Sequence, residues 1–168
     1  HNCEIYINQN YIQEAEKVKY MDNIPNECKT KLGPKYALIS KEYELLHKAI
    51  PSRKGVKRVM VYFGGIDEYN YTLKTIRAMM AWDLKDIKID AVMGQIKHNE
   101  SDLAKVIKER GNVEIHKNLK SLAGLMMKAD LSIGAGGSTT WERACLGLPS
   151  IVIATAENQL ETSINLDN

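Results

Sequence analysis

Apolar positions from residue 55 onward alternate between two spacings. Short continuous apolar runs are typical of strands buried on both faces, and apolar residues three or four positions apart are typical of helices. The expected strands are residues 59–63, 87–93, 113–115, 131–133 and 151–154, and the expected helices are residues 71–82, 103–109, 122–129 and 140–146. This regular alternation predicts an α/β domain with a Rossmann-like parallel sheet and helices on both faces.

Residues 1–34 do not continue this pattern. An apolar strand is expected at residues 5–7 and a helix at residues 11–20, and proline-containing turns follow them. We interpret residues 1–34 as the remnant of a preceding lobe and its connector, and residues 35–168 as one domain. The chain begins without a methionine and stops soon after a new helical pattern starts, so we expect both ends to be cuts in a longer protein.

Composition excludes more functions than it suggests. Of the 168 residues, 44% are hydrophobic, which is enough for a packed core, and the net charge is only +2. The lysines are scattered rather than clustered, which argues against nucleic-acid binding. No apolar run approaches the ~18 residues that a membrane-spanning helix needs.

The three cysteines lie far apart in the sequence and lack the spacing of metal ligands: they are Cys3, Cys28 and Cys145. Cys145 stands in an apolar stretch and is interpreted as a small core residue. With an odd number of cysteines and no signal peptide, the sequence favours a reducing, cytoplasmic location.

Two glycine-rich turns follow predicted strands, at Gly64-Gly65 and at residues 134–140, and the second leads directly into a helix. Ligands of open parallel sheets bind beyond the carboxyl ends of the strands, and glycines, backbone N–H groups and hydroxyls suit a diphosphate. Neither turn matches the phosphate-binding loop of nucleotide hydrolases or the dinucleotide fingerprint. A plain tight turn is equally compatible with the pattern, because Thr139 and Glu142 fit a capping box.

Longer motifs tie these turns to a known family. The segments concerned are residues 8–10, 32–38, 63–67, 134–143 (Gly-Ala-Gly-Gly-Ser-Thr-Thr-Trp-Glu-Arg), 146–150 (Leu-Gly-Leu-Pro-Ser) and 156–159 (Ala-Glu-Asn-Gln). In this order they resemble the UDP-sugar hydrolases of pseudaminic acid synthesis and the related spore-coat polysaccharide proteins. More distantly, the chain is similar to the C-terminal lobe of the glycosyltransferase that makes lipid II.

This resemblance implies the UDP-binding, C-terminal lobe of a two-lobed GT-B fold. The residues implied in UDP binding are Gly64, Gly65, Asn118, Leu119, Gly137, Ser138, Thr139 and Glu142. Among them, Glu142 would accept hydrogen bonds from the ribose hydroxyls, and the backbone of Asn118 and Leu119 would contact uracil. Asn158 and Gln159 would face the sugar, and Asn158 would orient the attacking water.

The chain departs from the family in one respect, because nothing in it matches the glycine- and histidine-containing loop that supplies the expected general base. The base would therefore lie on the missing N-terminal lobe, the partner of this piece. Without Asp-x-Asp or metal-ligand spacing we expect no metal and no other cofactor, with the UDP-sugar as substrate. Transfer of the sugar to another sugar or a lipid, or non-catalytic binding, stay open as alternatives to hydrolysis.

A few other residues allow two interpretations each. Asp67 either caps the following helix or contacts ligand, and His98 lies in a loop where it either faces ligand or is exposed. His47 and His116 are expected to be surface or structural residues. Trp141 is expected to pack beneath the glycine-rich loop.

Overall fold

The computed structural model describes residues 3–12, 21–22, 24–94 and 100–167. A five-stranded parallel sheet forms its centre, in the order β5-β4-β3-β6-β7. Its strands are β3 (Arg58–Tyr62), β4 (Lys88–Met93), β5 (Val113–Lys117), β6 (Leu131–Ala135) and β7 (Ser150–Ile153). The predicted parallel sheet is confirmed, with strand boundaries within about two residues of the expected ones.

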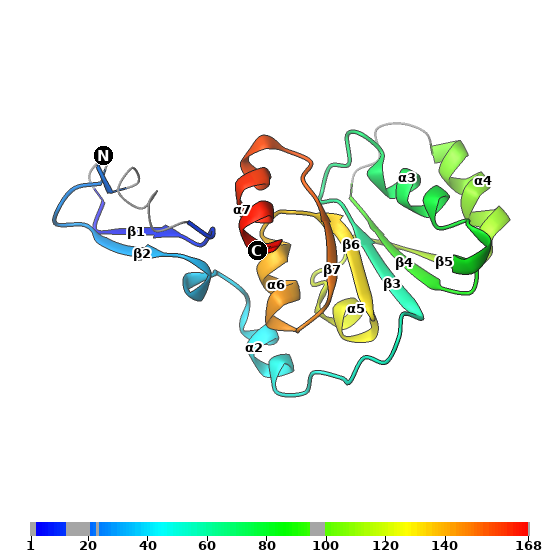
Figure 1. The fold of residues 1–168 in the computed structure, drawn as a ribbon, viewed down its shortest axis with the longest axis horizontal. Helices are drawn as coiled ribbons and strands as arrows, with labels where there is room; N and C mark the ends of the chain where they lie inside the picture. Colours follow the sequence, from blue (N-terminus) through cyan, green and yellow to red (C-terminus); the bar gives the residue numbers. More distant parts are fainter. Residues whose placement is uncertain (1–2, 13–20, 23, 95–99, 168) are drawn as a thin grey trace.

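Helices cover the sheet from both sides (Figure 1). They are α2 (Lys41–His47), α3 (Tyr71–Ala78), α4 (Glu100–Arg110), α5 (Ala123–Lys128), α6 (Thr139–Cys145) and α7 (Glu157–Asp167), with short 3₁₀ helices at Pro34–Tyr36 and Trp82–Leu84. Side chains of alternate strand positions point to opposite faces. Val61 therefore packs with Ile76 of α3 on one face, and Met60 packs with Met126 of α5 on the other.

One predicted helix is shorter than its apolar pattern indicated. The expected helix 71–82 ends at Ala78, with Met79 as its C-cap, and a separate 3₁₀ turn begins at Trp82. The apolar residues continue past the end of the helix because Met79 is buried in the same core. Hydrophobic spacing therefore located the buried face correctly but not the helix end.

The N-terminal segment forms a second, two-stranded parallel sheet of β1 (Ile5–Asn8) and β2 (Lys29–Leu32). Figure 1 shows it projecting from the main domain. The strand expected at 5–7 is confirmed. The strand β2 lies between the turn signals at residues 24–26 and 32–34 and was not predicted, because Lys-Thr-Lys-Leu carries only one apolar residue and gives no strand signal. Most of the helix expected at 11–20 lies outside the described residues.

The same segment brings Cys3 and Cys28 together, with 2.8 Å between their Sγ atoms. The hydrogen bond to Cys3 is the largest of the effects that raise the pKa of the Cys28 thiol to about 11. Because these two cysteines are 25 residues apart in the sequence, their contact was not predicted. Cys145 is half-buried between α6 and α2, with its Sγ atom 3.7 Å from the carbonyl oxygen of Tyr43.

None of the helices in the described part of the chain has the length and apolar character that a membrane crossing requires.

Candidate functional site

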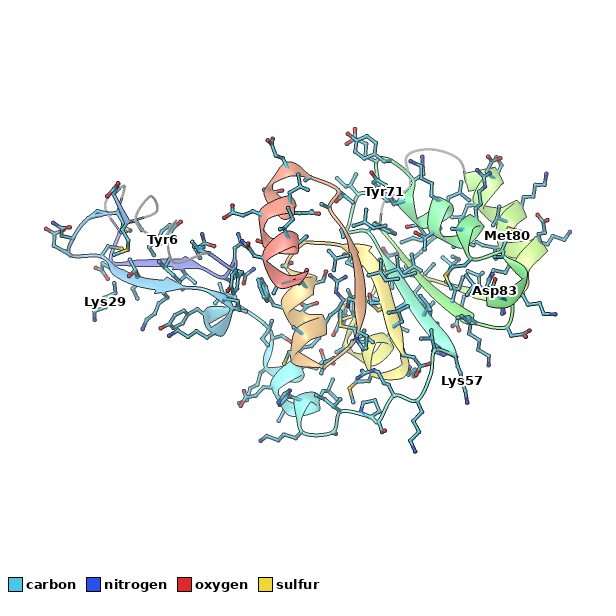
Figure 2. The ribbon with its side chains drawn as sticks, in the orientation of Figure 1. Tyr6, Lys29, Lys57, Tyr71, Met80 and Asp83 are labelled. Atoms are coloured by element: carbon cyan, nitrogen blue, oxygen red, sulfur yellow. The ribbon has the colours of Figure 1, made fainter. Side chains whose placement is uncertain are left out.

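The carboxyl ends of β3, β4, β5 and β6 lie at one edge of the sheet. In Figure 2 this edge is marked by Tyr71, at the start of α3, and the opposite edge by Lys57, just before β3. After β3 the chain turns at Gly64, whose φ of 93° is strained for any residue with a side chain. After β5 it turns at Asn118, whose φ of 55° lies in the left-handed region that asparagine tolerates. Both turns therefore lie at the strand ends where ligands of open parallel sheets bind.

A cavity of about 540 Å³ opens at this edge, between α2, the ends of β3 and β4, the turn after β5 and the start of α6. It brings together half of the residues implied by the resemblance, which are Gly65, Asn118, Leu119, Thr139 and Glu142. The strand-end rule and the motif therefore converge on one place. Among the lining residues that sequence reasoning missed are Tyr43, Tyr62 and Ser121.

Glu142 shares this cavity with two tyrosines, Tyr43 and Tyr62, and its charge acts on both. Burial first, and then the charge of Glu142, raise the pKa of the Tyr43 hydroxyl, which also interacts with Ser121. The same two causes raise the pKa of Tyr62. Both phenols thus stay protonated near neutral pH, and Glu142 is left as the acceptor of hydrogen bonds in a partly buried, polar wall.

The capping-box alternative for Glu142 does not fit the helix as it forms. That motif needs Thr139 as the N-cap, but the N-cap of α6 is Ser138, so Glu142 is one position too far along. Within the described residues, the Ser138 side chain makes no capping hydrogen bond. The carboxylate of Glu142 is therefore not part of a capping box.

The loop after β6 is held from one side and open on the other. Gln159 accepts hydrogen bonds from the N–H of Gly136 at 3.2 Å and from the N–H of Thr155 at 2.9 Å through the same Oε1 atom. A Cβ atom built on Gly137 would meet nothing within 4 Å, and Ser138 is exposed. The open side of this loop is the part that a ligand can approach.

The remaining predicted residues are not among those that line the cavity. Gly64, Gly137 and Ser138 flank it in the two glycine-rich turns, and Asn158 is exposed in the first turn of α7. Gln159 uses its side-chain oxygen to hold the loop. The sugar-facing roles of Asn158 and Gln159 stay predictions.

Asp67 caps α3. Its two carboxylate oxygens each accept a hydrogen bond of 2.8 Å, one from the N–H of Tyr71 and one from the N–H of Thr72. Of the two interpretations of this residue, the geometry favours the structural one.

Replacing Asp67 with alanine is expected to destabilise the chain by about 1–2 kcal/mol, because two helix N–H groups lose their acceptor. Chemical denaturation followed by circular dichroism measures this change. Asp67→Asn keeps one oxygen acceptor and should lose less. Equal losses in the two variants would contradict the capping role.

The other weighed residues have structural surroundings. The Nδ1 atom of His47 lies 2.6 Å from the carbonyl oxygen of Cys145 and links α2 to α6. Trp141 is buried, which agrees with a packing role. His98 lies outside the described residues.

His116 belongs to a polar cluster that its position in the sequence did not reveal. Its Nε2 atom lies 2.9 Å from Asp90 Oδ1, and Arg58 Nη1 lies 2.7 Å from Asp90 Oδ2. Glu114 completes a group of side chains whose ligand atoms lie within 4.8 Å of one another. Each oxygen of the buried Asp90 already has a partner, Arg58 for one and His116 for the other. The cluster therefore fits an ion-pair network better than a metal site.

Comparison with known proteins finds relatives in sequence and in fold. A scan against family models finds no match. The chain is 31% identical over 165 residues to an uncharacterised protein of Methanocaldococcus jannaschii and 26% identical over 132 residues to the spore coat polysaccharide biosynthesis protein SpsG of Bacillus subtilis. It is 25% identical over 164 residues to the UDP-2,4-diacetamido-2,4,6-trideoxy-beta-L-altropyranose hydrolase of Campylobacter jejuni.

The chain is a homologue of these proteins. It aligns over 95%, 78% and 97% of its own length with them, respectively, and spans 34%, 39% and 57% of theirs. The resemblance drawn from the motifs is thereby confirmed. The fold agrees as well, since the chain matches the crystal structure of Staphylococcus aureus TarM, solved with UDP, with a TM-score of 0.50 and 13% identity. That match covers 89% of this chain and 30% of TarM, a GT-B glycosyltransferase.

Proposed function

We propose that this chain is the UDP-binding lobe of a nucleotide-sugar enzyme that releases UDP from a UDP-linked, modified amino sugar by attack of water at the anomeric carbon. The observation that carries the proposal is the cavity in which Asn118, Thr139 and Glu142 meet at the carboxyl edge of the sheet. The hydrolase relative from Campylobacter jejuni, which aligns with almost the whole chain, supports the choice of reaction.

In the proposed complex, each part of UDP meets the chemistry that suits it. The turn at Asn118 and Leu119 offers backbone groups to the uracil edge, and the carboxylate of Glu142 accepts hydrogen bonds from the two ribose hydroxyls. The loop at Gly137, Ser138 and Thr139, with the Gly64-Gly65 turn, offers N–H and hydroxyl donors to the diphosphate. Those donors would stabilise the negative charge that develops on UDP as the anomeric bond breaks.

Attack of water needs a general base within hydrogen-bonding reach, and we assign that base to another lobe of the protein. The relatives are between about two and three times the length of the aligned part, which leaves room for such a lobe. The small sheet of β1 and β2 supports this, because two parallel strands rarely persist without further neighbours and Ile5 and Ile7 are exposed on it. Asn158, near the loop, would orient the water. We propose no metal or other cofactor.

Transfer to a saccharide acceptor in place of water is the second candidate, and the name of the Bacillus subtilis relative, a polysaccharide biosynthesis protein, favours it. The donor lobe alone serves both reactions. Incubating the full-length protein with UDP-sugar in ¹⁸O-labelled water separates them. Hydrolysis places the label in the released sugar, whereas transfer leaves the sugar unlabelled and joined to an acceptor.

The first test of the donor lobe is titration of this chain with UDP, followed by calorimetry and by thermal shift. UDP at ~100 times its dissociation constant is expected to add about 2.7 kcal/mol of stability. UMP should bind more weakly because it lacks one phosphate, and ADP more weakly because the turn at Asn118 fits uracil. Binding of ADP or NAD in preference to UDP, or no binding of UDP, would overturn the assignment.

A further inference from the structure

Arg143 is a fully buried arginine directly beneath the glycine-rich loop. Only 1% of its surface is exposed. Its Nη2 atom donates to the carbonyl oxygen of Ala135 and to Oγ1 of Thr140, both at 3.0 Å. Among the described residues, its Nε and Nη1 atoms have no hydrogen-bond partner and no carboxylate forms a salt bridge with it. Within the part of the chain that the structure describes, the positive charge of Arg143 is therefore buried without an ion pair.

Burying such a charge is unfavourable for the free energy of folding. Burial lowers the pKa of Arg143 to about 10, against the opposing effect of the charge of Glu142, so the guanidinium still carries its proton at neutral pH. Removing a buried charge from water is unfavourable, and a well-packed apolar side chain of similar volume is often no worse for stability. Buried charges that are unfavourable for folding often belong to functional sites.

The position of the guanidinium shows what the charge can act on. It contacts Ala135, the last residue of β6, and Thr140, in the first turn of α6, so it lies under the segment 136–139 that joins them. Its Nη1 atom lies 3.1 Å from the point where a Cβ atom on Gly134 would be. The guanidinium itself is buried, so its charge is screened less by solvent than that of an exposed arginine.

We infer that Arg143 supplies the positive potential that holds the diphosphate of the nucleotide on loop 136–139. The inference rests on the proposed function and deepens it. Glu142, the next residue, places a negative charge in the same cavity as the anionic ligand. The positive charge of Arg143 offsets this negative charge. The carboxylate that binds the ribose can therefore lie next to the loop that binds the phosphates. It acts through the loop, as a positioning residue, and selects for the charge of the ligand rather than for its base.

The test compares Arg143→Met and Arg143→Lys with the wild-type protein, using uridine, UMP, UDP and inorganic pyrophosphate as ligands in calorimetry. Arg143→Met is expected to weaken UDP and pyrophosphate about tenfold and to leave uridine within about twofold. Arg143→Lys keeps the charge and should keep most of the affinity. The ligand-free Arg143→Met protein should melt at the same temperature as wild type or higher.

Arg53 provides a matched control, because it is an arginine whose bonds are structural. It donates to the carbonyl oxygens of Ala129, Leu146, Gly147 and Met126, away from the glycine-rich loop. Arg53→Met should lower the melting temperature and leave the ratio of UDP to uridine affinity unchanged.

Two results would overturn the inference. One is an Arg143→Met protein that binds UDP and pyrophosphate as tightly as wild type. The other is equal loss for uridine and UDP together with a lower melting temperature in both Arg143 variants, which is the behaviour of a purely structural arginine. If the wild-type protein prefers ADP to UDP, the proposed function fails, and the pyrophosphate comparison still decides the role of Arg143.

Discussion

Replacing Glu142 with alanine is expected to weaken UDP binding about a hundredfold. In the proposed complex its carboxylate accepts hydrogen bonds from both ribose hydroxyls, and each hydrogen bond to a charged group contributes roughly 1.5–3 kcal/mol. Losing even the lower value twice gives roughly 3 kcal/mol, which corresponds to about two orders of magnitude in the dissociation constant. Calorimetric titration of the variant with UDP measures this loss.

Two comparisons separate ribose recognition from a general disturbance of the cavity. With 2′-deoxy-UDP, which lacks one hydroxyl, wild type should already bind less tightly, and Glu142→Ala should then cost less than it does with UDP. Glu109→Ala removes an exposed carboxylate in α4, on the other face of the sheet, and should leave UDP affinity unchanged. The role of Glu142 is contradicted if the variant loses the same factor for UDP and 2′-deoxy-UDP.

The sheet could be predicted from the sequence because its strands are nearly continuous apolar runs. Val59 and Val61 face one core and Met60 the other, so both faces required apolar residues and the run could only be a fully buried strand. β2 could not be found in this way, because Lys29 and Lys31 lie on its exposed face. Its pairing with β1 joins segments more than twenty residues apart, which no local pattern encodes.

The candidate site was predictable only where chain order and geometry coincide. Gly65, Asn118 and Thr139 follow strands of one parallel sheet, so the topology alone brings them to the same edge. Tyr43 reaches the cavity from α2, before the first strand of the sheet, through packing against α5 and α6. Asp90 and His116 likewise meet only because β4 and β5 are neighbours. Contacts of this kind depend on tertiary packing, and a single sequence carries no signal for them.

Gly134→Ala is expected to destabilise the domain strongly. Gly134 lies in β6 opposite Tyr62 of β3, and an added Cβ atom would overlap the carbonyl oxygen of Tyr62 and crowd Nη1 of Arg143. Neither strand can retreat, because β3 and β6 are interior strands of the sheet. We expect a loss of about 3 kcal/mol or more, and thus a melting temperature lower by roughly 6–12 °C.

Gly124→Ala makes the same chemical change where the structure has room, and it should act in the opposite direction. Gly124 is exposed in α5, and a Cβ atom there would meet nothing within 4 Å. Alanine is the better helix former, so this variant should be more stable by roughly 0.5–1 kcal/mol. Differential scanning calorimetry of the two variants measures both changes in stability.

Because Gly134 also leads into the loop at residues 136–139, its alanine variant should lose UDP affinity at temperatures where it is still folded, whereas Gly124→Ala should bind UDP as wild type does. If the Gly134→Ala protein had the same melting temperature as wild type, β3 and β6 would not approach as closely as described. The description of the base of the cavity, which these strands form, would then be wrong as well.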